Sequence, residues 1–199
     1  MHRQGIKNFP YYLGIRSLAD IATPADRVCV LNIMGGESRQ VTPVSHAFSD
    51  GNVVFGTSPG RAGQMLKTPV GDIPVFNNVR EGLDAGHAFN TGVVYLPPSG
   101  VRDGVAELIR VNPDLEKIVI ITEKIAIHDA REIRAMAQAN GVDIIGGNCL
   151  GVADSWNRVR IGGALGGDHP EESLIKGSVA IFSNSGGFTT TIAQYLATA

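Results

Sequence analysis

The turn at residues 56–63, GTSPGRAG, could bind a phosphate ester at the end of a short apolar run, residues 53–55. Thr57 and Ser58 offer hydroxyl groups and Arg61 offers a forked, positively charged donor, a combination that suits phosphate oxygens. In a doubly wound nucleotide-binding fold, an NAD site would place an Asp or Glu at the end of the second strand to bind the ribose hydroxyls. This turn contains no acidic residue, so it favours a phosphate over a bare diol.

Two glycine-containing turns have the composition of phosphate-binding turns at helix N-termini. In NIMGGESRQ (32–40), the two glycines would let backbone amides approach a diphosphate, although they could equally form a simple tight turn. In SNSGG (183–187), free amides and the hydroxyls of Ser183, Ser185 and Thr189 could hold a phosphate between an apolar run and a helical segment. The alternative for this second turn is ordinary helix capping by Ser185.

Two further strand ends carry polar residues that could contact a ligand. Glu123, in ITEK (121–124), is either a ligand contact or an acid at the start of a helix, and Asn148, in GGNCLG (146–151), is either a ligand contact or a turn residue. The five histidines show no zinc-protease spacing, because H-E-x-x-H does not occur. The sequence thus shows binding motifs without local nucleophilic or metal machinery, and no catalytic residue is predicted.

Composition and charge place the chain among ordinary globular proteins. The 199 residues are 43% hydrophobic and 18% charged, with a net charge of −2, so we expect no broad basic surface and no nucleic-acid partner. Two cysteines without metal-ligand spacing favour a reducing, cytoplasmic location. No apolar stretch approaches the roughly 20 residues of a membrane span, and the first residues do not resemble a signal peptide.

Short apolar runs that do not alternate with polar residues predict strands buried on both faces of a parallel sheet. Segments of helical pattern lie between several of them and predict βαβ units, hence an α/β, Rossmann-like, doubly wound parallel sheet. The expected strands are 28–34, 52–55, 73–76, 92–96, 117–122, 143–146 and 178–183, and the expected helices are 79–89, 101–111 and 128–140.

The same patterns divide the chain into four parts. We expect an N-terminal extension at 1–26, the Rossmann-like domain at 27–150, and a glycine-rich hairpin and linker at 151–176. Residues 177–199 read as the first strand and helix of a second α/β domain, or else as a unit that docks on the first sheet. One strand and one helix cannot bury themselves, so this last part needs further structure around it.

Taken in order, seven motifs resemble the α subunit of succinyl-CoA synthetase and the corresponding module of ATP-citrate lyase, from about Val28 to the last residue. The motifs are GGES (35–38), GTSPGRAGQ (56–64), IPVFNNVREG (73–82), VVYLPPS (93–99), ITEKI (121–125), GGNCLG (146–151) and SVAIFSNSGG (178–187). This superfamily of NDP-forming acyl-CoA synthetases has a Rossmann-like CoA-binding domain followed by a flavodoxin-like domain that carries a phosphorylated histidine. The resemblance therefore implies CoA as cofactor, and the sequence ends before the region expected to carry that histidine.

The resemblance also implies site residues and partners. It places CoA contacts at Met34, Gly35, Gly36, Glu37, Arg61, Ile121, Thr122 and Glu123, to which Asn148 is added as a ligand contact, and phosphate contacts at Ser183, Ser185, Gly186 and Gly187. The implied partners are an ATP-grasp subunit or domain and a small carboxylic acid. A tyrosine that often follows the phosphate turn in the family is Thr190 here.

Two alternatives share the expected fold. An NADP-dependent oxidoreductase or sensor could use Arg61 to bind a 2′-phosphate. A non-catalytic, CoA-responsive regulatory domain would need the CoA site alone. The nucleotide and the acid are not determined by these motifs.

Overall fold

The computed structural model describes residues 21–198 of the chain. Of the predicted N-terminal extension, residues 1–26, the first 20 residues lie outside the described part of the chain. Within residues 21–198, none of the helices has the length and hydrophobicity that a bilayer crossing requires.

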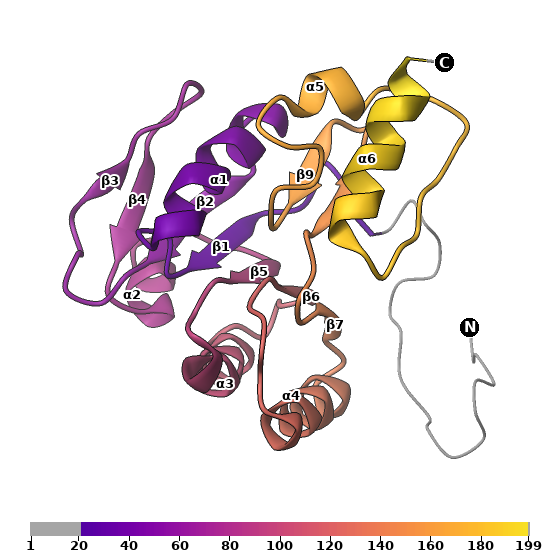
Figure 1. Cartoon of the computed structure of the whole chain (residues 1–199). Helices are drawn as coiled ribbons and strands as arrows, with labels where there is room; N and C mark the ends of the chain where they lie inside the picture. Colours follow the sequence, from indigo (N-terminus) through magenta and orange to yellow (C-terminus); the bar gives the residue numbers. More distant parts are fainter. Residues whose placement is uncertain (1–20, 199) are drawn as a thin grey trace.

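A seven-stranded sheet in the order β3-β4-β2-β1-β5-β6-β7 forms the centre of the molecule (Figure 1). Six strands are parallel, and only the edge strand β3 is antiparallel to its neighbour. The strands are β1 (Val28–Leu31), β2 (Val53–Thr57), β3 (Met65–Leu66), β4 (Ile73–Phe76), β5 (Thr91–Val94), β6 (Lys117–Ile120) and β7 (Asp143–Gly146). The direction of winding reverses between β1 and β5, which confirms the predicted Rossmann-like architecture.

Helices cover both faces of this sheet (Figure 1). On one face lie α2 (Val79–Asp84), α3 (Val101–Val111) and α4 (Ile127–Ala139), which bury Val79, Val105 and Ile133 against the strands. On the other lies α1 (Gly36–Phe48), and a short 3₁₀ helix, η2 (Pro98–Gly100), leads into α3. Every residue of β1, β5 and β6 is buried, because these strands are covered from both sides.

The predicted glycine-rich hairpin is present as β8 (Val152–Asp154) and β9 (Val159–Ile161). Val159 and Ile161 belong to the apolar cluster on the second face of the sheet. The short helix α5 (Pro170–Ser173) and the longer α6 (Gly186–Ala197) follow on the same side of the molecule (Figure 1). The hairpin thus covers the middle strands beside α1.

The strand predicted at 178–183 does not form, although the helix predicted after it does, as α6. Val179 and Phe182 are exposed in a segment without regular secondary structure. A strand is stabilised by backbone hydrogen bonds to a neighbouring strand, and no strand of residues 21–198 pairs with this segment. The apolar sequence alone was therefore a misleading signal here.

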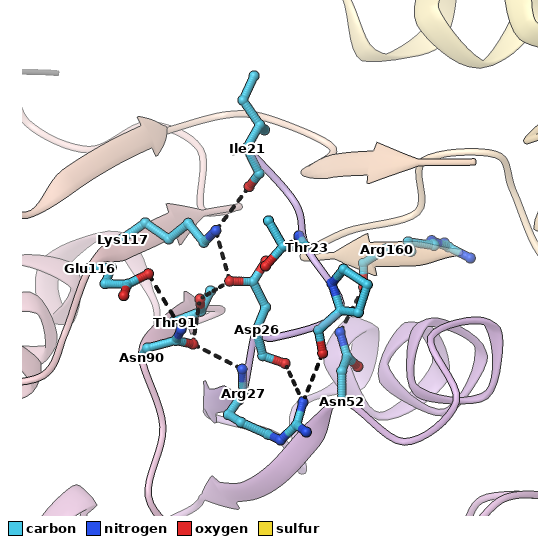
Figure 2. Close-up of polar contacts among 11 residues, drawn as sticks. Ile21, Thr23, Asp26, Arg27, Asn52, Asn90, Thr91, Glu116, Lys117 and Arg160 are labelled. Atoms are coloured by element: carbon cyan, nitrogen blue, oxygen red, sulfur yellow. Dashed lines mark hydrogen bonds and ion pairs between the residues drawn. The ribbon is translucent and has the colours of Figure 1, made fainter. Parts of the chain in front are cut away.

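A buried ion pair fastens residues 21–26 to the amino ends of the strands (Figure 2). Lys117 Nζ lies 2.8 Å from Asp26 Oδ1, with both side chains at most 4% exposed. The same ammonium donates to the Ile21 carbonyl at 3.1 Å, and Thr91 Oγ1 donates to Asp26 Oδ1 at 3.3 Å. This polar cluster lies at the opposite end of the sheet from the predicted site residues.

Candidate functional site

A pocket of about 380 Å³ lies at the carboxyl ends of β5 and β6, between the first turns of α1 and α6. Open α/β sheets bind ligands at this place, where the winding direction reverses. The pocket is lined by Glu37, Tyr95, Leu96, Ile121, Thr122, Glu123, Asn148, Cys149, Leu150, Gly186 and Gly187.

Seven of the predicted site residues line this one pocket, although they come from four separate segments of the chain. They are Glu37, Ile121, Thr122, Glu123, Asn148, Gly186 and Gly187. The parallel sheet explains the convergence, because the carboxyl ends of adjacent parallel strands meet at one edge. Met34, Gly35, Gly36, Arg61, Ser183 and Ser185 are not among the lining residues.

The turn between β1 and α1 is held by its own polar groups. Ser38 Oγ donates to the Asn32 carbonyl at 2.5 Å, and Asn32 Nδ2 donates to the Tyr95 carbonyl at 3.0 Å. A Cβ on Gly35 would lie 2.7 Å from Asn32 Nδ2, so a side chain here would displace the Asn32 amide. No side chain caps the N-terminus of α1, and the amides of its first turn remain available to a ligand.

Arg61 lies outside the pocket, in the turn after β2. Its side chain is exposed, and its amide donates to the Ser58 carbonyl at 3.0 Å. Ser58 Oγ in turn accepts the amide of Met34 at 3.1 Å. This bond joins the turn at 56–63 to the turn that precedes α1, so these two of the predicted phosphate turns are neighbours.

The residues after β6 form the floor of the pocket. Ile121 is buried and donates its amide to the Val94 carbonyl at 3.1 Å, whereas Thr122 Oγ1 donates to the Leu96 carbonyl at 2.6 Å. The Thr122 hydroxyl therefore stabilises the loop. Glu123 is exposed, and the amide of Asn148 donates to the Thr122 carbonyl at 3.0 Å, which ties the Asn148 turn to this floor.

The first turn of α6 forms the opposite wall. Ser185 occupies the N-cap position, but its side chain makes no capping hydrogen bond, so the alternative of ordinary capping by Ser185 is wrong. Ser183 Oγ instead accepts the amide of Ser185 at 3.0 Å and donates to its carbonyl at 3.1 Å. Both serines are exposed, and the amides of the first turn of α6 have no side-chain cap.

The side chains that line the pocket include two acids, Glu37 and Glu123, and no Lys or Arg. Burial raises the pKa of the Tyr95 phenol, and the nearby Glu37 carboxylate raises it further. Burial likewise raises the pKa of the Cys149 thiol, which lies 3.3 Å from the Ile120 carbonyl oxygen. Both groups stay protonated near neutral pH, and the thiol is poorly suited to act as a nucleophile.

Four lining residues were missed by the sequence analysis, namely Tyr95, Leu96, Cys149 and Leu150. Tyr95 and Leu96 were assigned to a strand at 92–96, but β5 ends at Val94. They follow β5 as directly as Ile121 follows β6, and that equivalence was the available signal. Among residues 21–198, no group of three or more His, Cys, Asp or Glu side chains could hold a metal ion.

Comparisons with known proteins agree with this geometry. Residues 33–124 match the family described as the CoA binding domain. Over 170 residues the chain is 31% identical to the ADP-forming sulfoacetate–CoA ligase subunit SqwL of an Acholeplasma species, covering 83% of this chain and 52% of the relative. It is also 31% identical over 144 residues to the ADP-forming succinate–CoA ligase subunit alpha 2 of Archaeoglobus fulgidus, covering 72% and 46% respectively. The chain thus spans about half the length of these relatives.

Solved structures show the same fold. The structure of ATP citrate lyase from Methanothrix soehngenii, in complex with citrate and coenzyme A, has a TM-score of 0.73 at 18% identity and covers 92% of this chain and 30% of that one. The resemblance predicted from the ordered motifs is confirmed: the chain contains a CoA-binding domain and is homologous to the α subunits of succinate–CoA ligases.

Proposed function

We propose that the pocket between α1 and α6 holds CoA, and that the chain supplies the CoA-binding part of an ADP-forming acid–CoA ligase. The observation that carries this proposal is the convergence of Glu37, Ile121, Thr122 and Glu123 on one pocket. All four fall within the residues that match the CoA-binding family. Asn148, Gly186 and Gly187 extend the same pocket beyond that match.

The donors around the pocket fit the phosphates of CoA. No cationic side chain lines the pocket, so phosphate oxygens would be bound by the uncapped amides of α1 and α6. A Cβ on Gly36 or Gly187 would meet nothing within 4 Å, so the backbone at both positions is open to close approach. Arg61, on the neighbouring turn, would add a forked donor for a further phosphate group.

The acids around the pocket fit the donors of CoA. Glu37 and Glu123 are exposed carboxylates that can accept hydrogen bonds from ribose hydroxyls, the adenine amino group or the pantetheine amides. Met34 and Gly35, in the turn before α1, would hold the first turn of that helix in place. Ser183 and Ser185 would complete the phosphate turn at α6.

The chemical role of these residues is binding and orientation. CoA supplies the nucleophile, a thiol that in the complete ligase would attack the carbonyl carbon of an acyl phosphate, form a thioester and release inorganic phosphate. The protein holds the nucleotide and directs the thiol, which is a proximity effect. The N-terminus of α6 would stabilise a phosphate group electrostatically, because its amides are not used by a side-chain cap.

We further propose the domain boundaries and the partners. Residues 27–150 would form the CoA-binding domain, 151–176 its linker, and 177–199 the beginning of a second α/β domain. The length of the relatives supports this division, as does the concentration of exposed Phe182, Phe188, Ile192 and Tyr195 near α6. An ATP-grasp subunit would handle the nucleotide, a small carboxylic acid would be the substrate, and two free thiols favour the cytoplasm.

Calorimetric titration with CoA and with NADPH tests the proposal. Substituting Gly187→Glu places a carboxylate in the first turn of α6, where it favours the helix but repels a phosphate. We expect CoA affinity to fall about tenfold or more, with no loss of thermal stability. His128→Glu is the matched control, because His128 is an exposed residue in the first turn of α4 and is not among the residues that line the pocket.

The outcomes separate the candidate functions. Binding of CoA by the parent chain and His128→Glu, but weakly by Gly187→Glu, supports the proposal. Tighter binding of NADPH than of CoA would favour the oxidoreductase or sensor. Equal CoA affinity of all three proteins would place CoA elsewhere.

A further inference from the structure

Arg160, in β9, carries a charged side chain that is only 1% exposed. Its Nε and Nη2 both donate to the Gly163 carbonyl, at 3.3 and 3.1 Å. Its Nη1 has no hydrogen-bond partner among the described residues. Buried guanidinium groups usually pair with a carboxylate, so a buried arginine that binds one carbonyl needs a specific explanation.

The carbonyl that Arg160 binds lies next to a carbonyl that contacts the pocket wall. Tyr95 Oη donates to the Gly162 carbonyl at 3.0 Å, and Tyr95 lines the pocket. Two successive carbonyls are thus held from two directions, one by a pocket residue and one by Arg160. A shift of the Gly162–Gly163 turn would move the hydrogen-bond acceptor of Tyr95.

The same turn also contacts the opposite wall. A Cβ on Gly163 would lie 3.1 Å from the Leu150 carbonyl oxygen, and a Cβ on Gly186 would lie 2.5 Å from Leu150 Cγ. Leu150 and Gly186 both line the pocket. The backbone of Gly163, the residue Leu150 and the first turn of α6 therefore form one close-packed row.

The backbone of Arg160 is anchored to the rest of the domain. Its amide donates to Ser49 Oγ at 2.8 Å, and its carbonyl accepts from Ser49 Oγ and from Asn52 Nδ2, the latter visible in Figure 2. Ser49 is the C-cap of α1, and Asn52 precedes β2. Arg160 thus contacts the end of α1 and the start of β2 through its backbone, and the Gly162–Gly163 turn through its side chain.

We propose that Arg160 is a positioning residue for the CoA pocket. Its guanidinium fixes the Gly162–Gly163 turn, and through that turn it positions Tyr95 on one wall and the first turn of α6 on the other. The ligand named here rests on the proposed function, whereas the network of contacts does not depend on it.

Three variants test this role by calorimetric titration with CoA. Arg160→Met keeps an unbranched side chain but removes both donors, and we expect CoA affinity to fall about tenfold. Arg160→Lys keeps the charge and one donor to Gly163, and we expect an intermediate affinity. Arg158→Met is the control, because Arg158 loses the same charge in the same hairpin but is exposed, with its guanidinium 5.1 Å from the centroid of the Phe48 ring.

A double-mutant cycle separates positioning from general destabilisation. If Arg160 acts through the Gly162–Gly163 turn, Arg160→Met and Tyr95→Phe together should weaken CoA binding by less than the product of their separate effects. Fully independent effects, or an unchanged CoA affinity of folded Arg160→Met, would overturn the proposal.

Hydrogen exchange of the ligand-free proteins tests the network of contacts around Arg160 independently of CoA binding. Arg160→Met should accelerate exchange of the amides at 162–163 and 186–187 while leaving β6 protected. Exchange that rises equally everywhere, or not at all, contradicts the positioning role. If Arg160→Met does not fold, CoA affinity and hydrogen exchange are both measured on Arg160→Lys, and parent-like values in both would refute the inference. Failure of the parent chain to bind CoA would count against the proposed function, and exchange would still decide the role of Arg160.

Discussion

At the scale of single residues, Arg61 is the cation of the predicted phosphate turn at 56–63, and its side chain is exposed. A charged hydrogen bond to a phosphate contributes about 1.5–3 kcal/mol. We expect Arg61→Ala to weaken CoA binding about tenfold or more at low salt. Added salt should penalise the variant less than the parent, because one charge pair has been removed.

Titration with 3′-dephospho-CoA identifies the group that Arg61 contacts. If parent and variant bind this analogue equally, Arg61 contacts the ribose 3′-phosphate, and if the difference persists, it contacts the diphosphate. Arg110→Ala serves as the control, since Arg110 is an exposed arginine in the last turn of α3. An unchanged affinity of Arg61→Ala for CoA at low salt would make the turn at 56–63 a solvated loop.

The sequence predicted which residues meet at the pocket better than it predicted what each one does. Glu123 and Asn148 were found because each follows a strand of a parallel sheet, whereas Glu37 was placed by the resemblance to the α subunit of succinyl-CoA synthetase. The role of Thr122 could not be inferred, because its hydroxyl is used by the Leu96 carbonyl, which is distant in sequence. Ser185 resembled a helix cap, yet Ser183 makes the local hydrogen bonds instead.

At the scale of secondary-structure elements, the buried pair Asp26–Lys117 joins the segment before β1 to the start of β6. Lys117→Met leaves the Asp26 carboxylate buried without its ammonium, and we expect the free energy of unfolding to fall by about 3–5 kcal/mol. CoA affinity should stay unchanged, because the pair lies at the other end of the sheet. Urea unfolding and calorimetry measure the two quantities.

The double variant Asp26→Asn/Lys117→Met provides the control for Lys117→Met. It removes both charges, so it should recover part of the lost stability. The single variants Asp26→Asn and Lys117→Met each lose some free energy of unfolding. If the double variant loses as much as the two single variants together, the packing of the two side chains matters more than their charges.

The segment 178–183 should exchange its amides quickly. It has no regular secondary structure, and Val179 and Phe182 are exposed, whereas β6 is buried at every position. Hydrogen exchange measured by mass spectrometry should therefore show fast labelling of 178–183 and slow labelling of 117–120. Comparable protection of the two segments would mean that 178–183 joins a sheet, and our domain boundary would then be misplaced.

Element boundaries were predictable where burial decides them and less so where turns begin. The strands at 73–76 and 143–146 and the helix at 101–111 match the structure to the residue. The strands expected at 28–34, 92–96 and 117–122 end two or three residues earlier, at Leu31, Val94 and Ile120. Ile33, Tyr95 and Ile121 lie beyond these ends and stay buried, but they belong to turns, and hydrophobicity does not distinguish a buried strand from a buried turn.

At the scale of the whole molecule, buried titratable groups should limit stability at both ends of the pH range. Burial lowers the pKa of His46 from its usual 6.5, so stability should fall as the pH drops below that value, when the unfolded chain binds the proton more readily. Burial raises the pKa of Cys29 above its usual 9.0, so stability should fall as the pH rises above 9, when the unfolded chain loses the proton first.

We therefore expect the unfolding free energy to be highest between these two values, with slopes of at most about 1.4 kcal/mol per pH unit for each group. Urea titrations across the pH range measure it. Cys29→Ala lowers the overall stability, but it should reduce the slope of the unfolding free energy against pH above pH 9. An unaltered slope would mean that other groups, such as Tyr95, cause the loss of stability at high pH.

The hairpin that packs on the second face of the sheet also has a consequence for the order of folding during synthesis. Ser49 and Arg160 are 111 positions apart, and Tyr95 and Gly162 are 67 apart. Contacts of such sequence separation form late, after the loops between them have closed. A ribosome-bound chain that has completed β7 therefore still lacks Val159 and Ile161, which pack with Val30, Val93 and Val119. Until β9 emerges, that apolar surface is a site where a chaperone or a second nascent chain can bind.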